Sequence, residues 1–125
     1  MTNQEIAVVY KWTAKPGNAE QLKAIYNDVE QQMKATEPNA LKVECYFDES
    51  TNDLVVYDLF KDSAALAQHL TETAAAHFPS LLQIATPGAF LFCGNVPEEL
   101  KQTAIGMGLN ATFAPRIFGF DRGLN

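Results

Sequence analysis

The chain has 125 residues, of which 47% are hydrophobic and 19% are charged, so its composition is that of one folded domain and not of a disordered segment. Its net charge of −6 argues against a surface for nucleic acid or anionic membranes, because both require clustered lysine and arginine. No basic and apolar leader precedes the first apolar run, and no apolar run reaches the roughly 20 residues of a membrane span, so we expect a cytoplasmic protein.

The first part of the chain predicts a strand followed by a helix. Residues 6–12 are rich in β-branched and aromatic side chains, which is typical of a strand. A turn is expected at Lys15-Pro16-Gly17. Asn18 then predicts a helix N-cap, with Gln21 placed to return a capping-box bond, and the helix is expected to end at Pro38.

The middle of the chain predicts a β-hairpin and a second helix. Residues 41–47 alternate apolar and polar side chains, and residues 54–60 form another apolar run beyond a polar loop. Asp62 occupies the position of a helix N-cap. We expect the helix over residues 63–76, with a bent continuation beyond Pro79.

A fourth strand is predicted at residues 89–93, opened by Pro87-Gly88. The order β-α-β-β-α-β is that of the ferredoxin-like α+β unit, which is a four-stranded antiparallel sheet with two helices on one face. We therefore assign residues 1–96 to one domain of this class and residues 97–125 to a C-terminal extension. The extension is too apolar for a free tail, so we expect it to pack on its own or a partner subunit.

The predicted strands are apolar on both faces, which a single layer of helices does not explain. In residues 54–60 and 89–93 both alternating sets of side chains are apolar, whereas a sheet with one solvated face alternates cleanly. Leaving a large apolar side chain in water costs roughly 1.5–3 kcal/mol. A second copy of the chain, packed sheet against sheet, would bury this apolar face. The pattern therefore predicts a homodimer, a dimeric α/β barrel.

Several motifs in residues 57–78 carry a family resemblance. Tyr57-Asp58 lies in the apolar strand, Ala67-Gln68-His69-Leu70 in the second helix, and His77-Phe78 follows. Together with the element order, these motifs resemble the antibiotic biosynthesis monooxygenase (ABM)-like domain family over about residues 6–96. The resemblance implies a dimeric α/β barrel. The chain has Asp58-Leu59-Phe60 where that family commonly has Glu-x-Trp.

The resemblance directs attention to His69, Asp58 and Tyr57 as catalytic residues. His69 borders an apolar helical stripe. Its imidazole either faces a cavity and transfers protons there, or forms a hydrogen bond with a backbone carbonyl. Asp58 lies among apolar neighbours, where a carboxylate either orients His69 or a substrate hydroxyl, or faces outward and pairs with Lys42. Tyr57 is expected to assist.

A second group of side chains is expected to bind the substrate. Aromatic residues on the strands suit a flat pocket for a planar ligand, although each also suits core or dimer packing. A histidine near a helix end either caps that helix or contacts the substrate. An arginine near the C-terminus either binds a carboxylate group or lies in a solvated tail. These residues are Trp12, Tyr10, Tyr46, Phe60, His77 and Arg116.

The family resemblance, together with these residues, therefore implies a cofactor-independent monooxygenase that acts on a small planar aromatic or quinol-type substrate. No metal site is expected, because the two histidines are eight residues apart and no third ligand follows at useful spacing. A non-catalytic ligand-binding or sensing module of the same fold is the first alternative. A haem-degrading relative is the second.

Overall fold

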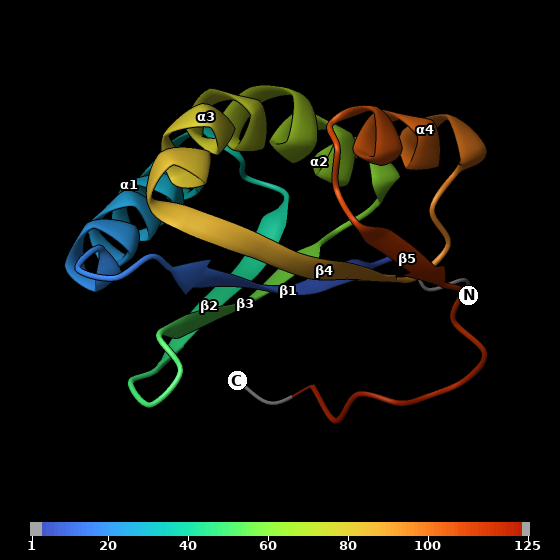
Figure 1. Ribbon diagram of the computed structural model, residues 1–125. Helices are drawn as coiled ribbons and strands as arrows, with labels where there is room; N and C mark the ends of the chain where they lie inside the picture. Colours follow the sequence, from blue (N-terminus) through green and yellow to red (C-terminus); the bar gives the residue numbers. More distant parts are fainter. Residues whose placement is uncertain (1–3, 124–125) are drawn as a thin grey trace.

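A single sheet with all helices on one face forms the body of the computed structural model, which describes residues 4–123 (Figure 1). The elements in chain order are β1 (Ile6–Ala14), α1 (Ala19–Thr36), β2 (Ala40–Asp48), β3 (Asp53–Phe60), α2 (Ser63–Gln68), the π-helical turn η1 (His69–Ala74), α3 (Ala75–Ile84), β4 (Ala85–Cys93), α4 (Glu98–Gly106) and β5 (Ala111–Ala114). No helix within residues 4–123 has the length and apolar character that crossing a membrane requires.

The sheet has the strand order β2-β3-β1-β4-β5. Its first four strands are antiparallel, which confirms the ferredoxin-like core. The predicted four-stranded antiparallel sheet is wrong in two respects, because residues 111–114 add a fifth strand and this strand runs parallel to β4. The direction follows from α4, which carries the chain back along the sheet as a crossover. Four residues of strand leave too short a pattern to be recognised in the sequence.

Helix α1 buries Leu22, Tyr26, Val29 and Met33, which recur at helical spacing, against the sheet. The predicted capping box at Asn18 is wrong. Its backbone has φ −110° and ψ 9° instead of the extended conformation of a cap, and its side chain bonds only the side-chain oxygen of Gln21. The helix ends at Thr36 with Glu37 as its C-cap, as expected from Pro38.

The second helix begins as predicted, because the Asp62 carboxylate accepts a hydrogen bond from the backbone N–H of Ala65 at 2.9 Å. It then continues through η1 and α3 to Ile84, which confirms the predicted continuation beyond Pro79. The expected break after residue 76 is wrong, because residues 75–84 form one helix. Strand β4 starts four residues earlier than expected, and its pairing with β1 shifts register near Pro87, which lacks a backbone N–H.

The core lies between the sheet and the helices. Ten of its larger side chains are less than 2% exposed, and they are Trp12, Phe60, Phe92, Ile6, Leu22, Met33, Leu66, Val56, Thr73 and Asp58. Thr73 and Asp58 are polar residues among these ten, and Glu37 and His69 are buried with them. Buried polar groups are costly unless they are hydrogen-bonded, so this cluster marks the part of the core where packing alone does not explain the sequence.

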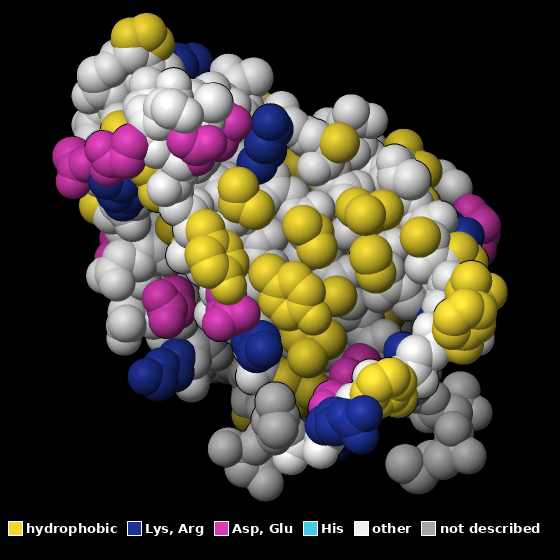
Figure 2. Space-filling model, turned by 90° about the horizontal axis from the view of Figure 1, so that it is seen from below, with side chains coloured by type: hydrophobic (Ala, Val, Ile, Leu, Met, Phe, Trp, Pro, Cys, Tyr) yellow, Lys and Arg dark blue, Asp and Glu magenta, His cyan; other side chains and the backbone are white. Residues whose placement is uncertain are grey.

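No helix of residues 4–123 covers the other face of the sheet (Figure 1). Figure 2 shows hydrophobic side chains gathered on it, and the chain beyond β5 passes beneath this face in Figure 1. Val9, Tyr57 and Leu59 are half-buried there, and Leu91 is 38% exposed. This apolar surface agrees with the pattern on which the homodimer was predicted, and the dimer itself stays a prediction.

Candidate active site

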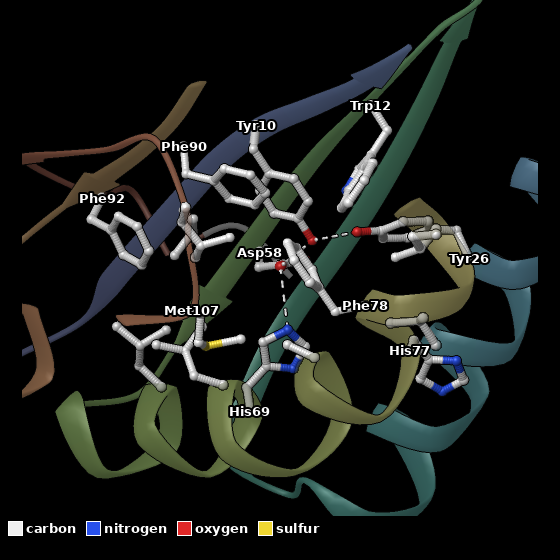
Figure 3. Close-up of a pocket in the computed structure, with 17 residues that line it drawn as sticks. Tyr10, Trp12, Tyr26, Asp58, His69, His77, Phe78, Phe90, Phe92 and Met107 are labelled. Carbon is white, nitrogen blue, oxygen red and sulfur yellow. Dashed lines mark hydrogen bonds and ion pairs between the residues drawn. The ribbon is translucent and has the colours of Figure 1, made fainter. Parts of the chain in front are cut away.

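A small cavity of about 40 Å³ lies between the sheet and the helical layer (Figure 3). Strands β1, β3 and β4 form its floor, η1 and α3 form its roof, and Met107 and Leu109 from the segment between α4 and β5 close one side. The C-terminal extension thus supplies part of the wall. A cavity of this size holds water or a small group, so an aromatic ring enters only when lining side chains move.

Aromatic rings line most of the floor. Tyr10 and Phe90, which face each other across β1 and β4, are stacked at a centroid distance of 4.5 Å and an interplanar angle of 17°. Trp12 meets the edge of Phe78 at 5.6 Å. These rings present a largely apolar surface that suits contact with a flat apolar molecule.

Asp58 is the polar group at the centre of the floor, and it is 2% exposed. The Tyr10 hydroxyl donates to Asp58 Oδ2 at 3.0 Å, and the Tyr26 hydroxyl donates to that of Tyr10 at 3.2 Å. Asp58 Oδ1 has no hydrogen-bond partner among the described residues. Burial raises the pKa of Asp58 to about 6, and burial together with the nearby carboxylate raises the pKa of Tyr10 well above its ordinary value. Asp58 therefore carries a proton readily near neutral pH.

His69 faces Asp58 from the helical layer (Figure 3). Its Nε2 atom lies 4.0 Å from Asp58 Oδ2, and its Nδ1 atom lies 3.2 Å from Glu37 Oε2. The imidazole, which is 5% exposed, therefore stands between two carboxyl groups and not against a backbone carbonyl. It opens the π-helical turn η1, and such wide turns occur frequently at functional sites.

Glu37 is the site residue that the sequence did not reveal. Only 3% of it is exposed, its Oε2 atom lies 3.2 Å from His69 Nδ1, and the same oxygen accepts a hydrogen bond from the Thr73 hydroxyl. Burial acts to raise the pKa of Glu37, but the interactions with His69 and Thr73 outweigh it and hold the pKa below its ordinary value. The signal in the sequence is an acidic residue at a helix C-terminus, where the helix dipole disfavours negative charge, immediately before Pro38.

The predicted site residues divide between the two faces of the sheet. Tyr10, Trp12, Asp58, His69 and His77 line the cavity. The ring of Phe60 packs beside that of His69 at 5.2 Å.

Tyr57 is not brought to the cavity, because neighbouring residues of a strand point to opposite faces. It lines a separate groove on the open face together with Arg116. Tyr46 also lies away from the cavity and is 57% exposed. None of these three residues lines the cavity that His69 lines.

Residues 5–79 match the family described as Antibiotic biosynthesis monooxygenase. A search of curated proteins found no match. Solved structures give fold similarity at low sequence identity. Rv0793 from Mycobacterium tuberculosis is 15% identical with a TM-score of 0.65, and the match covers 76% of this chain and 98% of that one. A variant of SnoaB, a cofactor-independent oxygenase from Streptomyces nogalater, is 14% identical with a TM-score of 0.61, covering 71% and 90%.

MupZ from Pseudomonas fluorescens shares more of the fold. It is 18% identical with a TM-score of 0.81, and the match covers 97% of each chain. The alignment therefore takes in the region of α4 and β5, which supplies the Met107 side of the cavity. At this level of identity the similarity shows the fold alone.

Proposed function

The chain belongs to the antibiotic biosynthesis monooxygenase family, and on this premise we propose that it oxygenates a small planar aromatic substrate without a bound cofactor. One observation supports the proposal above the others. His69 and Asp58 place a base and a proton carrier 4.0 Å apart inside a cavity that is otherwise walled by aromatic and aliphatic side chains.

The proton chemistry falls to His69 and Asp58. A phenolic hydroxyl lying against His69 Nε2 loses its proton to the imidazole, and Asp58 stabilises the imidazolium that results. A dry cavity keeps the phenolate poorly solvated and therefore electron-rich. Tyr10 donates to Asp58 and so holds that carboxyl in place.

The phenolate then passes one electron to molecular oxygen, and the two radicals combine at a ring carbon to give a hydroperoxide. The O–O bond breaks with loss of water, and a quinone carbonyl remains on that carbon. The balance is one phenol and one O₂ to one quinone and one water, in which the O–H and ring C–H supply both hydrogens of the water. The protein contributes positioning and proton transfer.

The substrate enters this cavity by displacing part of its wall. Met107 and Leu109 are suited to yield, because they belong to a connecting segment and a methionine side chain adapts its shape at low cost. Met107→Ala is therefore expected to widen the range of accepted ring systems, and a panel of one-, two- and three-ring phenols measures this.

Oxygen uptake and quinone absorbance test the proposal directly. The purified protein is mixed with the phenol panel under air, and turnover is expected with one O₂ consumed for each quinone formed. His69→Ala is expected to lower kcat by about 10²-fold or more. Glu72→Gln, an exposed change within the same turn η1, serves as the control and should keep full activity. Equal rates for His69→Ala and the wild-type protein would show that His69 is not the base.

A proton-transfer reaction that needs no oxygen is the second candidate function. It is favoured by the Asp58 carboxyl, whose pKa of about 6 lets it act as a general acid as well as a base. Turnover that persists under argon selects this function. Tight binding of an aromatic ligand with no turnover in either atmosphere selects a non-catalytic binding module.

A further inference from the structure

We propose that Glu37 is a positioning residue that holds the ring proton of His69 on Nδ1, so that Nε2 is the basic nitrogen that faces Asp58 and the cavity. Its catalytic consequence rests on the proposed function, whereas the tautomer itself does not.

The distances decide between the two neutral forms of the ring. A proton on Nδ1 donates to Glu37 Oε2 across 3.2 Å, which is at the long end of a normal hydrogen bond. A proton on Nε2 faces Asp58 Oδ2 across 4.0 Å, which is beyond hydrogen-bond length. The proton therefore belongs on Nδ1, and the lone pair belongs on Nε2.

A chain of hydrogen bonds converges on Glu37 from the other side. His77 Nε2 lies 2.9 Å from Gln32 Oε1, Gln32 Nε2 donates to the Thr73 hydroxyl at 3.3 Å, and that hydroxyl donates to Glu37 Oε2. Every donor in this chain points toward the carboxylate.

The direction of this chain indicates its role. A side-chain amide such as that of Gln32 donates and accepts hydrogen bonds but passes a proton poorly, so the chain does not suit proton transport. It stabilises the negative charge of Glu37 instead. An ionised Glu37 is the stronger acceptor for the His69 N–H, because bonds to charged groups are roughly twice as strong as neutral ones.

The two carboxyl groups beside His69 thus have different environments. Glu37 receives two hydrogen bonds from the helical layer, whereas Asp58 receives one from Tyr10. Each carboxyl leaves its other oxygen, Glu37 Oε1 and Asp58 Oδ1, without a partner among the described residues, so the difference lies in the number of bonds that each receives. Glu37 remains an anion that orients the ring. Asp58 remains the group that exchanges a proton with the cavity.

Imidazole nitrogen NMR tests this assignment without any substrate. The chain has only two histidines, so ¹⁵N-histidine labelling gives two ring systems, and a His77→Asn variant assigns them. At a pH where the ring is neutral, the wild-type His69 is expected to carry its proton on Nδ1 by at least about tenfold over Nε2. A wild-type ring protonated mainly on Nε2 overturns the proposal, whatever the variants do.

Two substitutions distinguish the effect of the hydrogen-bond acceptor of Glu37 from the effect of its packing. Glu37→Met keeps the buried volume but removes the acceptor, so the Nδ1 preference is expected to fall at least about tenfold. Glu37→Gln keeps an acceptor oxygen and is expected to restore the Nδ1 form. Glu72→Gln is the matched control and should leave the spectrum unchanged, because this residue is exposed. An Nδ1 form that persists unchanged in Glu37→Met overturns the proposal.

Activity gives a separate readout once a substrate is turned over. Glu37→Met is then expected to lower kcat by about 10²-fold and to leave KM within about threefold, because it misplaces a base without touching the substrate. A loss confined to KM contradicts a positioning role. If no phenol is turned over but the Nδ1 form is found, the oxygenase function fails and the role of Glu37 in orienting His69 stands.

Discussion

The Asp58→Asn variant is expected to be more stable than the wild-type protein at pH 7.5 and to lose this advantage at pH 4. Burial raises the pKa of Asp58 from its ordinary 3.8 to about 6. The folded protein therefore binds this proton more tightly than the unfolded chain does. The contribution of Asp58 to the free energy of unfolding is complete below pH 4 and is lost as the pH rises through 6.

The pKa difference sets the size of the effect. Each pH unit corresponds to about 1.4 kcal/mol, so ionisation of Asp58 lowers the free energy of unfolding by about 3 kcal/mol between pH 4 and pH 7.5. Asparagine has nearly the same shape and stays neutral, and its side-chain oxygen still accepts the Tyr10 hydroxyl. The stability gap between the variant and the wild-type protein is therefore expected to widen by about 3 kcal/mol with rising pH.

Urea unfolding of both proteins at pH 4, 5, 6 and 7.5 measures this gap. The fluorescence of Trp12, the single tryptophan of the chain, reports unfolding because its side chain is buried. Asp48→Asn provides a control of opposite sign, since hydrogen bonds from Ser50 lower the pKa of the exposed Asp48 and its ionised form stabilises the fold. A gap for Asp58→Asn that stays constant, or that widens toward low pH, would refute the argument that burial controls this carboxyl.

Three further outcomes are expected. Tyr10→Phe removes the donor to Asp58 and should lower the free energy of unfolding by about 1.5–3 kcal/mol at pH 7.5 in the same urea assay, and an unchanged midpoint contradicts the bond. Asp62→Ala removes the N-cap of α2 and should cost about 1 kcal/mol, measured by thermal unfolding, whereas a neutral result leaves the cap without energetic weight. Light scattering at micromolar concentration should give twice the 13.8 kDa chain mass, and Leu91→Glu on the open sheet face should give the monomer mass. A monomer mass for the wild-type protein contradicts the predicted homodimer.

Local patterns in the sequence predicted much of the secondary structure. The apolar spacing of α1, the Asp62 cap and the hairpin of β2 and β3 each depend on residues close in the chain, and the structure has them. The prediction failed in two ways. Strand β5 depends on a distant residue pairing, because β4 offers it an edge, whereas the capping box failed locally, because the backbone at Asn18 is not extended.

The sequence by itself determined the ferredoxin-like order and directed attention to His69 and Asp58, because element order and composition are properties of the chain alone. Only the tertiary structure decided which side chains meet. It placed Glu37, which is 32 residues from His69, against that ring, and it placed Tyr57 on the far side of the sheet although it precedes Asp58 directly. The reason is that a strand alternates its faces at every residue, whereas contact between elements depends on how they pack.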